Sequence, residues 1–233
     1  MLFSWDDQII RWFRDASAYT GFHKTLAQKI KPYLTPGDTF CDLGCGIGRL
    51  SLELAPAVSE ITAVDISEAA IGSLRRDAEA LGIRNLNAQV RDASLLTNSF
   101  DVVLMSFFEM KDKTDFIKLC NRRLIRILNA ENMSGLYPQR HRRIVKETVP
   151  DLKADLDLRG VVYKLELCQA EFGQPFRSWL DAELYIRKNA PEASEAEINE
   201  FLNERVTHTG RNDFPFYLPN PKTVGIFITD REK

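Results

Sequence analysis

The feature that most constrains the fold is a glycine-rich turn within residues 39–50. A short apolar run that contains Asp42 is followed by glycine at three alternate positions, Gly44, Gly46 and Gly48. A helical pattern of apolar residues begins directly after them. A strand, a tight turn and a helix start arranged in this way let a ligand approach bare backbone. The stretch therefore predicts a strand–turn–helix unit with a ligand at its turn.

The residue types in this turn narrow the kind of ligand. A dinucleotide-binding turn has its third glycine one position later, where this chain has Arg49. Asp42 would repel a pyrophosphate, whereas a carboxylate suits a ligand that carries positive charge. S-adenosylmethionine carries both an ammonium and a sulfonium group. We therefore expect this cofactor in place of a dinucleotide.

A second acid stands where a nucleotide-binding unit needs one. The apolar run 61–66 predicts the next strand, and Ser67 with Glu68 predicts the start of a helix after it. Asp65 then lies at the carboxyl tip of a parallel strand, where an acid accepts hydrogen bonds from ribose hydroxyls. Asp92 follows a weaker strand at 86–90 and is placed to meet an adenine edge. A fourth strand at 100–105, apolar nearly throughout, indicates a sheet that is covered on both faces.

Residues from about 20 to 110 resemble a class I S-adenosylmethionine-dependent methyltransferase. The resemblance rests on residues 42–48, 64–67, 92–93 and 101–104. It implies a Rossmann-like, doubly wound α/β fold whose seven-stranded sheet is mostly parallel, with the last strand antiparallel. It also implies that Asp65 holds the ribose, that Ile66 packs on the adenine and that Asp42 lies near the ammonium. The residues expected at the cofactor are Asp42, Gly44, Cys45, Gly46, Gly48, Asp65, Ile66, Asp92, Ala93, Ser106 and Tyr19.

The second half of the chain predicts further strands at 124–128, 161–172 and 223–228, and a basic helix at 138–148. Roughly fifty residues separate the last two strands, where a hairpin needs only a few. They hold two helical patterns and several aromatic residues, so we expect a folded cap. With the N-terminal helices it is expected to roof the carboxyl edge of the sheet and form an acceptor pocket; the alternative is an oligomer interface.

The expected organisation is one methyltransferase domain over residues 1–233. Within it we expect N-terminal helices over the site, a core, an inserted helical cap and a last strand. Their respective ranges are 1–34, 35–172, 173–222 and 223–229.

The motifs that are absent favour a small-molecule methyl acceptor. The fourth strand ends in Ser106-Phe107-Phe108-Glu109, which is not the Asn/Asp-Pro-Pro-aromatic turn of nucleic-acid amino-methyltransferases. There is no Pro-Cys pair and no acidic cluster for a metal. Two alternatives remain open. One is a macromolecular (RNA or protein) methyltransferase that docks through Arg140 to Arg143, and the other is a non-catalytic module that binds S-adenosylmethionine.

No side chain is assigned a catalytic role, and no metal is expected. Glu109, His23 and His208 could each act as a base. For all three, the sequence favours a surface or capping role.

Composition limits the partners and the compartment. A net charge of −2 gives no overall attraction to nucleic acid or to an anionic membrane. The N-terminal residues lack a secretory pattern, and no apolar stretch approaches the roughly 18 residues that span a bilayer. The four cysteines are scattered, which predicts buried free thiols and a cytoplasmic setting.

Overall fold

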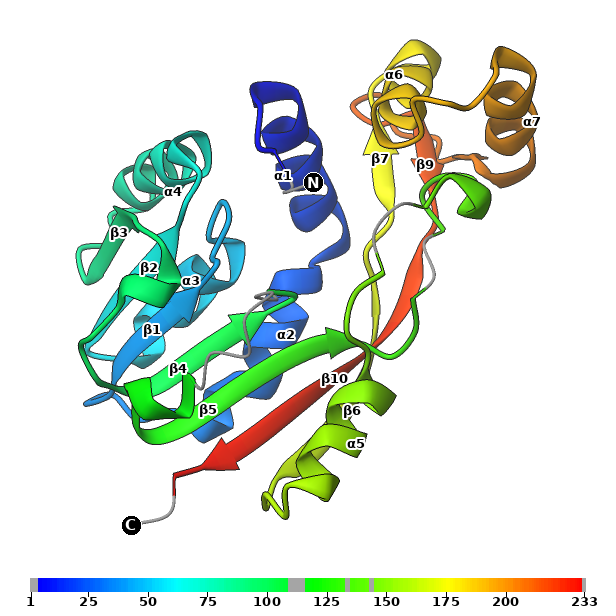
Figure 1. The fold of residues 1–233 in the computed structure, drawn as a ribbon. Coiled ribbons are helices and arrows are strands. Elements are labelled where there is room, and N and C mark those ends of the chain that lie inside the picture. Colours follow the sequence, from blue (N-terminus) through cyan, green and yellow to red (C-terminus); the bar gives the residue numbers. More distant parts are fainter. Residues whose placement is uncertain (1–3, 109–115, 133–134, 143–144, 232–233) are drawn as a thin grey trace.

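The central element of the fold is a seven-stranded sheet with strand order β3-β2-β1-β4-β5-β10-β6 (Figure 1). The computed structural model describes residues 4–108, 116–132, 135–142 and 145–231. Neighbouring strands from β3 to β5 are parallel, and β10 is antiparallel to both β5 and β6. The strands are β1 Thr39–Leu43, β2 Glu60–Asp65, β3 Leu86–Val90, β4 Phe100–Ser106, β5 Cys120–Asn129, β6 Lys164–Glu171 and β10 Pro221–Asp230. The predicted sheet, with its last strand antiparallel, is confirmed.

Helices cover both faces of this sheet because its inner strands are apolar on both sides. Alternate residues of a strand point to opposite faces. Phe40 of β1 accordingly packs under α2, α3 and α4, whereas Cys41 belongs to the core on the other face. The helices are α1 Asp7–Thr20, α2 Phe22–Ile30, α3 Arg49–Leu54, α4 Glu68–Ala80 and α5 Val149–Leu158. None of the helices within the described residues has both the length and the apolar character needed to cross a bilayer.

The chain between β6 and β10 forms a group of elements that we call the cap. It contains the helices α6 Trp179–Asn189 and α7 Glu195–Arg205, and a small sheet of β7 Gln174–Phe176, β9 Phe216–Leu218 and β8 Thr207–His208. This cap has its own buried cluster, to which Phe176, Ile186 and Leu202 contribute. Trp12 of α1 belongs to the same cluster, so the N-terminal helix and the cap share one core. The cap stands at the ends of β6 and β10, beside α1 (Figure 1).

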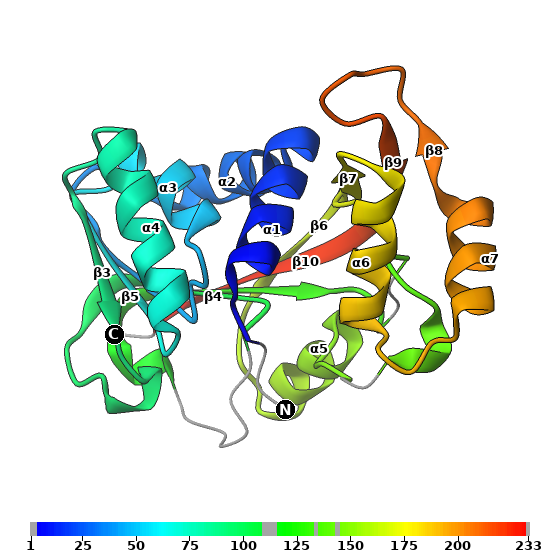
Figure 2. The ribbon, with the colours of Figure 1, turned by 90° about the horizontal axis from the view of Figure 1, so that it is seen from above.

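Helix α1 lies between α4 and α6 and contacts both (Figure 2). Toward the cap, the carboxylate of Asp181 accepts hydrogen bonds from Trp12 Nε1 at 2.9 Å and from Arg11 Nη2 at 2.5 Å. Toward the main sheet, Arg14 donates to both carboxylate oxygens of Asp77, at 2.7 Å and 3.1 Å. A largely buried charge is stabilised only when it is paired and hydrogen-bonded, as Asp181 is. These bonds fix the position of α1 relative to the glycine-rich turn.

The predicted basic helix over residues 138–148 is wrong. The described part of this stretch contains one 3-10 turn, Gln139–His141, and α5 begins only at Val149. Thr148 and Asp151 form a capping box that starts α5. Pro150 has no backbone N–H, so it fits the first turn of α5 but not the interior of a helix that began earlier in the chain. Arg143 lies outside the described residues. The sixth strand is also shorter than expected, beginning at Lys164.

Candidate functional site

The glycine-rich turn is closed onto the tip of β2. The N–H of Gly46 donates to Asp65 Oδ2 at 2.9 Å, and the N–H of Ser67 donates to Asp65 Oδ1 at 2.8 Å. Cys45 donates its backbone N–H to the carbonyl oxygen of Val64 at 3.0 Å. Because β1 and β2 are parallel neighbours, their carboxyl ends lie at the same edge of the sheet. The two motifs predicted separately from the sequence therefore form one structure.

Asp42 lies beneath this turn as a buried carboxyl group. Its side chain accepts a 2.5 Å hydrogen bond from Ser51 Oγ, and the residue is only 3% exposed. Burial is the main cause that raises the pKa of Asp42 to about 7; the Ser51 hydrogen bond opposes this shift, and the charge of Asp65 adds to it. A cation close by would favour the ionised form. Asp42 therefore suits a positively charged ligand group.

Two aromatic rings lie directly on the bare backbone of the turn. Gly44 and Gly46 have φ values of 67° and 54°. A Cβ added at Gly44 would lie 2.1 Å from the ring of Phe108, and one at Gly46 would lie 2.6 Å from the indole of Trp5. Aromatic faces attract cations, including sulfonium-type groups. Trp5 was expected only as part of the N-terminal roof over this edge of the sheet. Phe108 was not expected at the turn, although its position just past the β4 tip was a usable signal.

An exposed apolar side chain directly follows Asp65 at the end of β2. Ile66 is 55% exposed. The N–H of Arg91 donates to the carbonyl oxygen of Asp65 at 2.9 Å, so the end of β3 lies beside it. The exposed carboxylate of Asp92 accepts hydrogen bonds from the N–H and hydroxyl of Ser94, at 2.8 Å and 2.7 Å, and these bonds lower its pKa. The structure thus brings Asp65, Ile66 and Asp92 to neighbouring strand tips.

Four other predicted residues support this edge of the sheet. Gly48, with a φ of 63°, begins α3 and packs against the buried Leu74. Cys45 is half-buried, and burial raises the pKa of its thiol. Ala93 is buried in the core below the β3 tip, and Ser106 ends β4, which pairs with β1.

Tyr19 lies apart from the glycine-rich turn. Its ring stacks on Tyr217 at a centroid distance of 4.8 Å and meets Phe214 edge-on at 5.9 Å. The guanidinium of Arg211 lies 5.1 Å from the centre of the same ring. Within the described part of the chain, Tyr19 has contacts with the cap and none with the turn.

The three candidate bases have different surroundings. His23 is buried, contrary to the expected surface or capping role: its Nδ1 lies 2.8 Å from Ser17 Oγ, and its ring meets Phe172 at 5.5 Å. Burial, with the nearby charges of Arg49 and Lys222, lowers the pKa of His23 to about 3. His208 is exposed on β8, as expected, and Glu109 lies outside the described residues.

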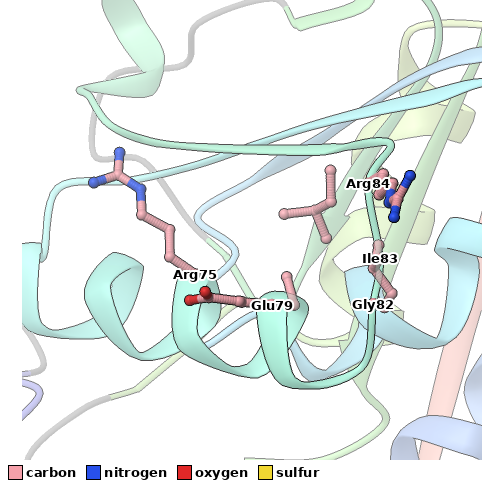
Figure 3. Close-up of a pocket in the computed structure, with 7 residues that line it drawn as sticks. Arg75, Glu79, Gly82, Ile83 and Arg84 are labelled. Atoms are coloured by element: carbon pink, nitrogen blue, oxygen red, sulfur yellow. The ribbon is translucent and has the colours of Figure 1, made fainter.

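A hollow of about 420 Å³ lies elsewhere on the molecule, between the end of α4 and the start of β3 (Figure 3). Arg75, Glu79 and Arg84 are among its lining residues. Leu86, which also lines it, begins β3, whereas the glycine-rich turn follows the end of the parallel strand β1. The hollow is therefore at the opposite edge of the sheet and plays no part in this site.

The part of the chain that contains β1 to β5 is similar to known proteins. Residues 40–128 match the family model described as "Methyltransferase domain". Ribosomal protein L11 methyltransferase of Thermosipho melanesiensis is 30% identical over 63% of this chain and 59% of its own length. The chloroplastic magnesium protoporphyrin IX methyltransferase of Arabidopsis thaliana is 40% identical over 29% of this chain and 22% of its own. The chain therefore spans less than two thirds of the length of these curated relatives.

The fold is also shared with solved structures. Magnesium protoporphyrin IX methyltransferase from Synechocystis PCC 6803, crystallised with bound SAH, aligns over 99% of this chain and 90% of that protein with a TM-score of 0.54. The two sequences are only 17% identical, so the alignment shows a common architecture.

Proposed function

Because its residues 40–128 belong to the class I S-adenosylmethionine-dependent methyltransferase family, we propose that the protein transfers a methyl group from S-adenosylmethionine to a small-molecule acceptor. The product of the cofactor would be S-adenosylhomocysteine. The scattered cysteines, which are free thiols, support a reducing compartment such as the cytoplasm.

The observation that carries this proposal is the closure of the glycine-rich turn onto Asp65. Only a bare backbone fits there, and Asp65 offers the remaining acceptor capacity of its carboxylate to ribose hydroxyls. Ile66 supplies exposed apolar surface next to it for an adenine. The buried Asp42 lies beneath the same turn, where it would complement an ammonium group. The residues present therefore fit the cofactor.

Methyl transfer from a sulfonium mainly requires the protein to position the acceptor. When bound, S-adenosylmethionine supplies a methyl group on a sulfonium, which is a good leaving group. The chain must hold the acceptor atom in line with that methyl and keep water away. Trp5 and Phe108, which lie on the turn, exclude water from its backbone. His23 stays neutral because its pKa is low, so it is a weak base.

The surface around Arg140 gives little support to a macromolecular acceptor. Arg140 forms an ion pair with Glu197 of α7, and His141 Nε2 lies 3.0 Å from the same carboxylate. This acid offsets part of the local positive charge that an RNA-docking face would need. The similarity to a ribosomal protein methyltransferase keeps a protein acceptor as the alternative. A module that binds the cofactor without catalysis is the other alternative.

Calorimetric titration of the protein with S-adenosylmethionine, S-adenosylhomocysteine and NAD tests the cofactor. We expect the first two to bind and NAD not to bind; binding of NAD alone would refute the proposal. Methyl-labelled cofactor is then incubated with small-molecule, RNA and protein fractions. Label in the small-molecule fraction is expected, and label only in protein or RNA would favour the alternative acceptors. Cofactor binding with no labelled product in any fraction would favour the non-catalytic module.

A further inference from the structure

Lys222 lies in the corner where β10 begins, at the same edge of the sheet as the glycine-rich turn. It pairs with Ala170 of β6, and two residues later Val224 pairs with the last residue of β5. Its Nζ lies 5.7 Å from the ring centre of Phe172 and 5.9 Å from that of Phe107. A hollow of about 440 Å³, which Lys222 and Glu171 both line, lies where β6 ends and β10 begins. Lys222 is thus a half-buried cation held between two aromatic rings.

The protein supplies Lys222 with no counterion among the described residues. Among these residues its ammonium forms no hydrogen bond or ion pair, and it lies near the centres of the two rings. Glu171 lines the same hollow, but it is the neighbour of Ala170 on β6, so its side chain leaves the opposite face of the sheet. Its carboxylate accepts 2.6 Å hydrogen bonds from the hydroxyl of Tyr217 and the N–H of Asn220. Oε1 of this acid is therefore already hydrogen-bonded within the protein.

Two further cations add positive charge to the corner. Lys146 Nζ donates to the carbonyl oxygen of Phe107 at 3.0 Å, and Arg142 donates to Asn132 Oδ1 at 3.2 Å. Burial, together with the charges of Lys146 and Arg142, lowers the pKa of Lys222 to about 8. Like charges that are partly removed from water repel one another, and an anion between them relieves this cost. The corner is therefore electrostatically arranged to receive a negative group.

The tip of β4 connects this corner to the glycine-rich turn. Phe107 is the one non-glycine residue of the described chain with a positive φ, 52°. Such a backbone is unfavourable for a residue with a side chain and persists where the surroundings require it. With this backbone at Phe107, the ring of Phe107 lies by Lys222, whereas the ring of the next residue, Phe108, lies on Gly44. The rings of Phe107 and Phe108 would therefore separate an acceptor bound at Lys222 from the glycine-rich turn.

We propose that Lys222, with Lys146 and Arg142, binds an anionic group, a carboxylate or a phosphate, of the small-molecule methyl acceptor. This inference rests on the proposed function, and it specifies that the methyl acceptor is negatively charged. The flanking rings of Phe107 and Phe172 favour an acceptor with a flat apolar portion next to the anion.

The test uses three probes of similar shape: benzoate, phenyl phosphate and the neutral benzamide. Each is titrated by ligand-observed NMR into the full chain, with and without saturating S-adenosylhomocysteine. The variants are Lys222→Met, which keeps the length of the apolar stem, Lys222→Arg, which keeps the charge, and Lys118→Met as the matched control. Lys118 is exposed just before β5, at the opposite edge of the sheet.

We expect at least one anion to bind about tenfold or more tightly than benzamide, since charge-assisted contacts are the stronger ones. Lys222→Met should remove this preference, whereas Lys222→Arg and Lys118→Met should retain it. The tighter of the two anions identifies a carboxylate or a phosphate substrate. Equal binding of the three probes to the wild type, or an undiminished preference in a folded Lys222→Met, would overturn the proposal. Binding of S-adenosylhomocysteine is measured separately, so failure at the cofactor is distinguished from failure at Lys222.

Discussion

Asp65 and Gly46 are joined by a 2.9 Å hydrogen bond from the backbone N–H of the glycine to the carboxylate of the acid. This bond places the acid at the tip of β2 against the turn that follows β1. It also leaves the other carboxylate oxygen bound only by the N–H of Ser67 among the described residues. A carboxylate oxygen can accept more than one hydrogen bond, so Asp65 can hold the turn and a ligand hydroxyl at once.

Replacing Asp65 with alanine should weaken binding of S-adenosylhomocysteine by about 1–3 kcal/mol, because the ribose loses charge-assisted hydrogen bonds. Asp65→Asn should fall between this variant and the wild type, since its amide oxygen can still accept from the turn. Calorimetry measures the affinities, and Asp155→Ala, which changes a half-buried acid on α5 that pairs with Arg159, is the control. Unchanged affinity in a folded Asp65→Ala would remove Asp65 from the site.

Replacing Gly48 with alanine should destabilise the protein more than the same change at Gly21. Both glycines have a left-handed backbone, with φ values of 63° and 66°, which costs an alanine about 1–2 kcal/mol. At Gly48 the new Cβ would also lie 2.4 Å from a methyl carbon of the buried Leu74, whereas nothing lies within 4 Å at Gly21. Overpacking adds about 1–3 kcal/mol. Urea unfolding of the two variants measures the difference, and equal losses would contradict this account.

The ionisation of Asp42 should make stability depend on pH. Its pKa is about 7 in the folded protein, against an ordinary value of 3.8. Between these values the folded state retains a proton that the unfolded chain releases, so stability from this group falls as pH rises from about 4 to about 7 and is then constant. The full loss is about 4 kcal/mol.

Asp42→Asn cannot titrate at this position and should lack that decline. The difference in unfolding free energy between the wild type and this variant isolates Asp42, because the other titrating groups cancel. Urea unfolding at intervals between pH 4.5 and pH 7.5 gives the comparison. Parallel pH profiles for the two proteins would show that Asp42 ionises normally.

Trp5 should report cofactor binding through its fluorescence, since its indole lies on Gly46. Trp12 is buried in the core of the cap, and Trp179 packs edge-on against Phe216 with ring centres 5.5 Å apart. Titration with S-adenosylhomocysteine should therefore change the emission of the wild type and of Trp179→Phe, but not that of Trp5→Phe. A change that persists in Trp5→Phe would place the ligand away from this ring.

Local sequence patterns were sufficient to predict most strands of the main sheet. Glycines with positive φ, acids after apolar runs and the Ser67 cap are determined by neighbouring residues, so the strands and the turn were predicted correctly. The same kind of reasoning failed at residues 138–148, where a run of basic residues was interpreted as a helix. That stretch has no apolar face to pack, and the capping box at Thr148 starts the helix later.

The sequence by itself determined where most strands of the main sheet lie along the chain. It also determined the acids and glycines that meet at their tips, because parallel strands bring their carboxyl ends to one edge. Only the tertiary structure decided the surroundings of His23 and Lys222. Their aromatic neighbours, Phe172 and Phe107, come from distant parts of the chain. Burial and the sum of nearby charges determine how such groups behave, and both are properties of packing that no local pattern contains.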